Sequence, residues 1–126
     1  MRYVLDTSFA IDQLRGDPVA VGRFRELFAA GDDPYLNEVV VCELAAGSSA
    51  PHDPDLLALL GAVEFIQPGP DSALLAGRWR AEARRRGFTL SLPDALIAAA
   101  ADSLGATVLT RNVRDFALTP VPVASY

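Results

Sequence analysis

The chain contains no lysine, one cysteine and one histidine among its 126 residues. Cys42 has no partner for an internal disulfide, and because it lies in an apolar run we expect a buried, unreactive thiol. With His52 as the only histidine, zinc clusters and Ser-His-Asp triads are both excluded. The absence of lysine excludes a receiver domain, which needs an active-site lysine. Cofactor and catalytic chemistry must therefore rest on other side chains.

Long hydrophobic runs are also absent. No run approaches the roughly 18 to 20 apolar residues that span a bilayer. Residues 1–5 lead directly into an expected strand, which leaves no room for a signal peptide, so we expect a cytoplasmic protein without a membrane partner. A hydrophobic content of 51% and a charged content of 21% are typical of a globular protein, and the length predicts a single domain over residues 1–126.

The formal net charge of −5 at first argues against a polyanionic partner. Its distribution matters more, because all eleven basic residues are arginine and five lie in one nine-residue window with a single acid, Glu82. If four acids were held at a metal site, the remaining acids would nearly balance the arginines. The cluster is either the solvated end of a helix or a surface that binds phosphates. Its members are Arg78, Arg80, Arg84, Arg85 and Arg86.

Short β-rich runs alternate with helical patterns along the chain. Strands are expected at 2–5, 34–37, 63–66, 107–109 and 121–123, and helical periodicity covers 9–14, 19–30, 54–60, 71–86 and 92–104. The segment 38–46 is ambiguous, because its valines favour a strand while its second half favours a helix. This alternation predicts an α/β sandwich around a mostly parallel sheet.

The helix expected at 92–104 is the most sharply defined element. Proline is tolerated in a first helical turn, and Ser91 is suited to cap the helix, so Pro93 and Ser91 together place its start. Asp94 must then lie at the N-terminal end. In the nine residues after Asp94 the only charge is Asp102, which indicates a helix buried over most of its circumference.

Several acids occupy positions from which they can reach one edge of such a sheet. Asp6 ends the first strand, and both Asn112 and Asp115 follow the strand at 107–109. Ligands of open parallel sheets bind beyond the carboxyl ends of the strands, and Asp94 at its helix N-terminus can reach the same edge. Glu43 lies inside an apolar segment, where an ionised group needs a partner or a cation.

Carboxylates that converge without lysine or histidine repel one another, and a divalent cation removes that conflict. Oxygen ligands without cysteine or histidine favour Mg²⁺ or Mn²⁺. Such ions activate water and stabilise in-line displacement at phosphorus. The implied reaction is metal-dependent hydrolysis of a phosphodiester.

Each of these residues, taken alone, also has an ordinary structural interpretation. Asp94 could simply favour the helix dipole, and Asp6 could cap the following helix. Asp115 could be a turn residue, and Glu43 could pair with an arginine. A phosphatase that forms an aspartyl phosphate would need a second acid two residues after Asp6, where the chain has Ser8.

Four short motifs, in their order along the chain, resemble those of the PIN-domain family, and within it the VapC-type toxin ribonucleases of type II toxin–antitoxin systems. The resemblance extends over essentially the whole chain. The motifs are VLDTS at 4–8, VCEL at 41–44 with Gly47, PDALIAA at 93–99, and LTRN at 109–112 with Asp115 and Phe116.

The resemblance implies a three-layer α/β/α sandwich and a Mg²⁺- or Mn²⁺-dependent endoribonuclease with its acids at one edge of the sheet. It also implies that Glu43 lies in a helix beginning near residue 37 or 38. The acids it assigns to metal binding and catalysis are Asp6, Glu43, Asp94 and Asp115, the last being the least firmly matched. Supporting positions are Ser8, Thr110 and Asn112, although the latter two are turn formers when taken alone.

Proteins of this family bind an antitoxin that occupies the groove of the site, and they typically dimerise. The resemblance therefore implies three partners: an RNA substrate, a cognate antitoxin and a second copy of the chain. A module of the same fold that binds RNA or a protein but has lost its catalysis is the alternative. Retention of all four acids favours the enzyme.

Overall fold

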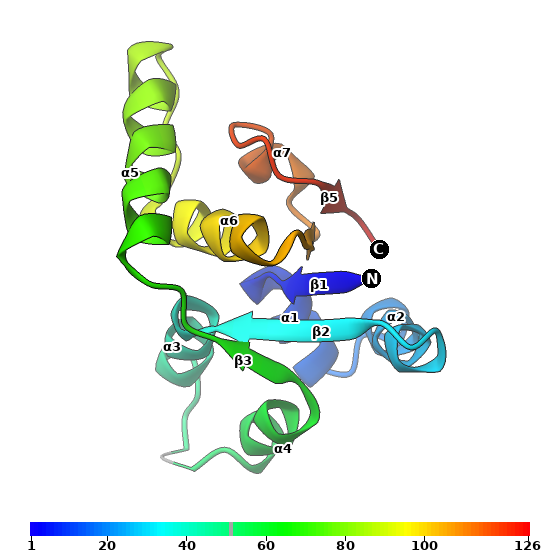
Figure 1. The fold of residues 1–126 in the computed structure, drawn as a ribbon. Helices are drawn as coiled ribbons and strands as arrows, with labels where there is room; N and C mark the ends of the chain where they lie inside the picture. Colours follow the sequence, from blue (N-terminus) through cyan, green and yellow to red (C-terminus); the bar gives the residue numbers. More distant parts are fainter. Residues whose placement is uncertain (51) are drawn as a thin grey trace.

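The protein, described by a computed structural model over residues 1–50 and 52–126, is built on one five-stranded sheet (Figure 1). The strand order is β3-β2-β1-β4-β5, and every adjacent pair is parallel. The strands are β1 (Arg2–Leu5), β2 (Asp33–Asn37), β3 (Glu64–Ile66), β4 (Thr107–Leu109) and β5 (Val123–Ala124). The predicted parallel sheet is confirmed.

Helices cover both faces of this sheet. From β1 the chain runs outward through β2 to β3, then returns across the sheet to β4 and β5. Crossovers between parallel strands are right-handed, so a reversal of direction changes the face on which the helices lie. Helices α1–α4 therefore lie on one face and α5–α7 on the other. Figure 1 shows α5, α6 and α7 together on one side. The expected α/β/α architecture is confirmed. The helices are α1 (Thr7–Leu14), α2 (Pro18–Ala29), α3 (Glu38–Ala46), α4 (Pro54–Ala62), α5 (Pro70–Arg85), α6 (Leu92–Leu104) and α7 (Val113–Phe116).

Helix α6 begins and ends where its sequence predicts. The Ser91 hydroxyl accepts a hydrogen bond from the Asp94 backbone N–H at 3.2 Å, which satisfies one of the free donors of the first turn. Gly105 ends the helix with φ +62°, a left-handed conformation that glycine adopts without strain. Asp94 is thereby fixed on the first turn of a rigid element.

The alanines of α6 allow α5 to approach closely. Ala95 and Ala99 of α6 pack against Ala76 and Ala83 of α5, and all four are buried. On the sheet side, the fully buried Ile97 contributes to the main core with residues of β1 and β4. Close packing on both sides makes α6 a firm support for the side chains at its N-terminus.

Helix α3 resolves the ambiguous segment and corrects two expectations. Residues 38–46 form a helix, as the resemblance implied, and it buries Val40 and Leu44 one turn apart. Cys42 lies away from that buried side and is exposed, so the expectation of a buried thiol was wrong. Glu43 is exposed as well, so its apolar neighbours in sequence do not surround it in space.

Several element boundaries differ from the predictions by one or two residues, and two of the differences have a clear local cause. Helix α4 was expected over 54–60 but continues through Gly61 to Ala62, because Val63 is the first residue with extended backbone. The edge strand β5 occupies 123–124 and not 121–123, because Pro122 has no backbone N–H to donate to the ladder. Among the described residues, no helix is both long enough and apolar enough to cross a membrane.

Candidate metal centre

The two central strands, β1 and β4, end side by side where the chain changes direction across the sheet. The connection after β1 leaves toward β2, while the connection after β4 leaves toward β5, so the loops diverge at this point. The ladder continues to the end of the strands, where the Asp6 backbone N–H donates to the Leu109 carbonyl at 3.0 Å. Such a switch point opens the crevice in which parallel α/β sheets bind ligands.

Asp6 lies at this crevice with its side chain fixed by two hydroxyls. It is only 4% exposed, and its Oδ2 accepts hydrogen bonds from Ser8 Oγ and Thr110 Oγ1, each at 2.7 Å. Asp6 precedes α1 but does not cap it through its side chain. Within the described part of the chain no hydrogen bond reaches Oδ1, so this oxygen is available as a ligand.

The two hydroxyls are themselves positioned by the turn that follows β4. The Arg111 backbone N–H donates to Ser8 Oγ at 3.2 Å, and the Asn112 backbone N–H donates to Thr110 Oγ1 at 2.9 Å. Each hydroxyl accepts from a fixed donor and directs its own proton to Asp6. The Asn112 side chain is exposed, and its contribution to this network comes through the backbone.

Asp94 approaches the site from the first turn of α6. Burial raises the pKa of Asp94 from 3.8 to about 6; the hydrogen bond with Ser91 opposes this shift, and the negative charges of Asp6, Asp115 and Glu43 add to it. The raised pKa means that the ionised form of Asp94 is unfavourable in the folded protein. The other three acids contribute to the free-energy cost of ionising it.

Glu43 and Asp115 form the exposed part of the acidic set. Glu43 Oε1 accepts a hydrogen bond from Thr7 Oγ1 at 2.7 Å, which ties α3 to the residue directly after Asp6. Asp115 on α7 lines the same open groove as Asp94. The four predicted acids thus lie directly after β1 and on α3, α6 and α7, and the charges of Asp6, Glu43 and Asp115 all act on Asp94.

No basic side chain neutralises these acids within residues 1–50 and 52–126. The ion pairs found there join Met1 to Asp32, Arg23 to Glu26 and Arg111 to Asp12. An arginine partner for Glu43, the structural alternative, is therefore not observed. An all-oxygen donor set with uncompensated negative charge fits a hard divalent cation.

The acids do not form a closed ligand cage. In the described part of the chain, no three acidic, histidine or cysteine side chains stand close enough together to hold a metal ion in their present positions. Asp6 is locked by its hydroxyls and Glu43 is held by Thr7, whereas Asp115 is exposed and free to change rotamer. A cation binding here would draw the exposed carboxylates inward.

A second network, which sequence reasoning missed, holds the turn after β4. The Arg111 guanidinium contacts both carboxylate oxygens of Asp12, at 2.8 and 2.9 Å, and the hydroxyl of Tyr126 donates to the same carboxylate. The Tyr126 ring also packs edge-on against Phe9 at 4.8 Å between centroids. No sequence signal joins residues about a hundred positions apart, and the contact between Thr7 and Glu43 was missed for the same reason.

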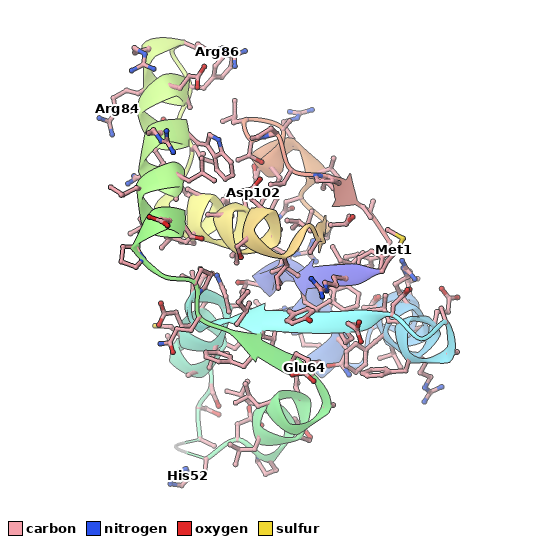
Figure 2. The ribbon with its side chains drawn as sticks, in the orientation of Figure 1. Met1, His52, Glu64, Arg84, Arg86 and Asp102 are labelled. Atoms are coloured by element: carbon pink, nitrogen blue, oxygen red, sulfur yellow. The ribbon has the colours of Figure 1, made fainter. Side chains whose placement is uncertain are left out.

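The arginine cluster lies apart from the acids. Figure 2 shows Arg84 and Arg86 at the end of α5 that projects from the body of the protein. Arg78, Arg84, Arg85 and Arg86 are exposed, while Arg80 is half-buried and donates from Nε to the Leu90 carbonyl at 3.0 Å. Four of the five guanidinium groups are therefore accessible to a ligand.

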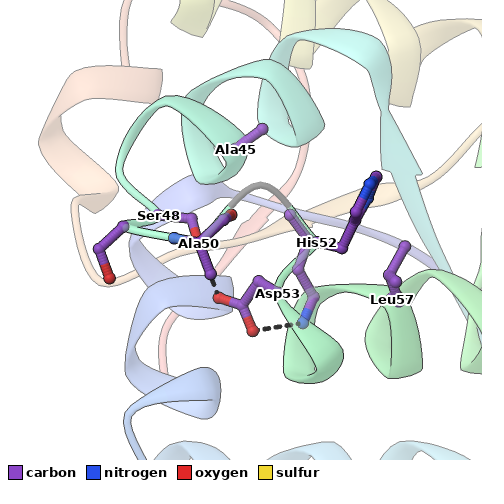
Figure 3. A pocket seen from close by; sticks show the side chains of 8 residues that line it. Ala45, Ser48, Ala50, His52, Asp53 and Leu57 are labelled. Carbon is purple, nitrogen blue, oxygen red and sulfur yellow. Dashed lines mark hydrogen bonds between the residues drawn. The ribbon is translucent and has the colours of Figure 1, made fainter.

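A further hollow of about 370 Å³ lies between α3 and α4 (Figure 3). Asp53 on its wall caps α4 by accepting from the Asp55 backbone N–H at 2.9 Å, and it also accepts from Ser48 Oγ at 3.1 Å. His52 lines this hollow, whereas none of the predicted site acids does. Its polar contacts serve helix capping.

Comparison with known proteins places the chain in a family. The PIN domain family model matches residues 3–121. Ribonuclease VapC19 of Mycobacterium tuberculosis is 35% identical over 117 residues, which cover 93% of this chain and 94% of that protein.

Solved structures agree with this assignment. The VapBC2 structure from Rickettsia felis, bound to a DNA fragment from its promoter, matches with a TM-score of 0.87 at 24% identity, covering 100% of this chain and 99% of that one. A toxin–antitoxin complex from Klebsiella pneumoniae matches with a TM-score of 0.76 at 27% identity, covering 97% and 95%. The chain belongs to the PIN-domain family.

Proposed function

We propose that this protein is the toxin of a type II toxin–antitoxin pair and acts as a metal-dependent endoribonuclease. The observation that carries the proposal is the acidic group at the switch point, which meets no basic side chain in the described chain. Burial raises the pKa of one of its members, Asp94, to about 6, and the charges of the other three acids add to this rise. The similarity to ribonuclease VapC19 supports the reaction class.

In this proposal Asp6 and Asp94 hold Mg²⁺ or Mn²⁺, and Glu43 and Asp115 complete the ligand set or accept a proton from the attacking water. Such an ion, when bound, would activate water and stabilise charge at the scissile phosphate. Ser8 and Thr110 both donate their hydrogen bonds to Oδ2 of Asp6, which leaves Oδ1 for the ion. The N-terminus of α6 adds a favourable field for the anionic substrate.

The exposed arginines at the end of α5 are proposed to bind the RNA backbone away from the cut. Guanidinium groups bind phosphate through paired hydrogen bonds, and their accessibility in Figure 2 permits this. They compensate locally for the overall charge of −5. Strength of binding should therefore depend steeply on salt.

The proposed protein partners are an antitoxin and a second copy of the chain. The Klebsiella pneumoniae relative was solved as a toxin–antitoxin complex. An acidic site accepts the arginine or lysine of a partner peptide as readily as it accepts a cation, so an inserted basic side chain would displace the metal. The negative charge that holds the ion for catalysis would therefore also bind the basic side chain of an inhibiting antitoxin.

The direct test is cleavage of a defined single-stranded RNA by the purified chain. We expect cleavage with added Mg²⁺ or Mn²⁺ and none in excess EDTA. Unchanged cleavage in EDTA would exclude the metal mechanism, and no cleavage under any condition would favour the binding module without catalysis.

A pair of isosteric variants ties the reaction to the site. Asp94→Asn should abolish cleavage while the fold survives, because it removes a proposed ligand without changing the shape of the side chain. Asp102→Asn on the same helix is the matched control, since Asp102 is exposed at the opposite end and should leave the rate unchanged. Full activity of Asp94→Asn would remove Asp94 from the site.

A further inference from the structure

An open groove of about 590 Å³ lies between the α5–α6 connection and α7. Its size falls within the range of roughly 300–1,000 Å³ that is usual for small-ligand sites. Its lining includes Asp94 and Asp115, two of the proposed metal ligands, together with Phe88 and Thr89. A ligand lying in it would therefore extend from the acids to an aromatic ring.

The backbone that carries Phe88 is fixed by a turn at the end of α5. The Phe88 N–H donates to the Ala83 carbonyl at 2.9 Å, and the Gly87 N–H donates to the Arg84 carbonyl at 3.0 Å. Together with φ +82° at Gly87, these two bonds form a Schellman motif that ends α5. Although 53% of Phe88 is exposed, its position follows from a rigid turn.

One arginine lies against the ring, and another lines the groove. The Arg86 guanidinium lies over the Phe88 ring, 5.8 Å from its centroid. Arg114 on α7 lines the groove beside Asp115, and it is exposed without an ion pair in the described chain. A groove that presents an exposed aromatic ring and a guanidinium group has the combination that binds single-stranded nucleic acid, through stacked bases and neutralised phosphates.

We propose that this groove binds an unpaired nucleotide next to the scissile phosphate, with its base stacked on Phe88 and its phosphate contacted by Arg114. The inference rests on the proposed function in taking RNA as the ligand. Charge complementarity and continuity with the acids favour RNA over a protein segment. Because a base must leave its own stack to lie on Phe88, the site selects single-stranded RNA.

Binding of a fluorescein-labelled single-stranded RNA of twelve nucleotides, measured by anisotropy in EDTA, tests the proposal independently of cleavage. Phe88→Leu should raise the Kd about 5- to 150-fold, the equivalent of one lost base–aromatic stack. Phe88→Trp should bind at least as well as the natural chain. Phe65→Leu, on the edge strand β3, is the matched control, since Phe65 is 50% exposed and lies outside the groove.

Abasic substitution then identifies the base. A series of the same RNA is prepared, each with an abasic site at a different position. One RNA of the series should bind the natural chain and Phe88→Leu with the same Kd. In that RNA the base that stacks on Phe88 is missing, so loss of the ring has no further effect. If Phe88→Leu weakens every abasic RNA by the same factor, Phe88 does not stack on a base and the proposal is wrong.

The outcomes separate this inference from the proposed function. If the natural chain cleaves RNA but Phe88→Leu binds and cleaves as the natural chain does, the inference alone falls and the groove is left to a protein segment. If the natural chain binds RNA through Phe88 but never cleaves it, the proposed function alone falls. If it neither binds nor cleaves RNA, both fall.

Discussion

Asp94→Asn should stabilise the metal-free protein at neutral pH. The half-buried carboxylate of Asp94 has a pKa raised to about 6, first by burial and then, against the Ser91 hydrogen bond, by the three neighbouring acids. Above that pH the folded protein must hold an unfavourable negative charge, whereas the unfolded chain ionises Asp94 freely. An asparagine of the same shape carries no charge in either state.

The size of the effect follows from the shift. A pKa that rises from 3.8 to about 6 corresponds to about 3 kcal/mol at most. Partial solvation of the side chain and the loss of a favourable interaction with the helix N-terminus reduce this figure, so we expect about 1–2 kcal/mol. Because the folded pKa is the higher one, the stability contributed by protonated Asp94 is complete below about pH 3.8 and is lost as the pH rises through 6.

Urea unfolding in EDTA at several pH values between 4 and 8 measures this difference. The free energies of unfolding of Asp94→Asn and the natural chain should be nearly equal at pH 4 and should diverge through pH 6, with the variant more stable above it. Asp71→Asn is the control, because Asp71 is an exposed first-turn acid of α5 that does not line the groove of Asp94 and Asp115. That variant should show no gain across the same interval.

Two outcomes would refute this reasoning. A variant that is less stable than the natural chain at every pH would show that the helix dipole outweighs burial at Asp94. A gain that does not change with pH would show that ionisation is not its cause, and that the charge of the acidic group is compensated in solution by something other than a metal.

Two further predictions concern a support of the site and the arginine cluster. Thr110→Val removes the fully buried hydroxyl that donates to Asp6, so it should lower the free energy of unfolding by about 1.5–3 kcal/mol and slow cleavage; unchanged urea unfolding would contradict the role given to this bond. Replacing Arg84, Arg85 and Arg86 together by glutamine should weaken RNA binding and reduce the slope of log K against log salt by about 2. An unchanged slope would make the cluster a solvated helix end.

Much of the fold could be predicted because its signals are local. Ser91, Pro93 and Gly105 fix α6 through capping and backbone conformation, whatever surrounds the helix. Segment 38–46 could not be assigned from propensity, because three valines oppose a helix that tertiary packing of Val40 and Leu44 then stabilises. Cys42 was misplaced for the same reason, since burial within an apolar run depends on which side of the helix faces the core.

The candidate site was predictable in its members more than in its arrangement. Motif order singled out the four acids as candidate ligands, and parallel topology explains why Asp6 and the turn after β4 meet. The sequence offered no means of knowing that Asp6 would be bound by two hydroxyls, or that Arg111 would pair with Asp12. These contacts join distant residues, and their geometry emerges only when the sheet has assembled.

The central claim is that these acids hold a divalent cation for cleavage of RNA, and Mn²⁺ binding tests it most directly. Electron paramagnetic resonance of free Mn²⁺, titrated with the protein at pH 7.5, counts the ions bound per chain. We predict at least one Mn²⁺ bound to the natural chain and to Asp102→Asn, with binding lost in Asp6→Asn and in Asp94→Asn. Absence of binding to the natural chain, or equal binding by all four proteins, would contradict the account.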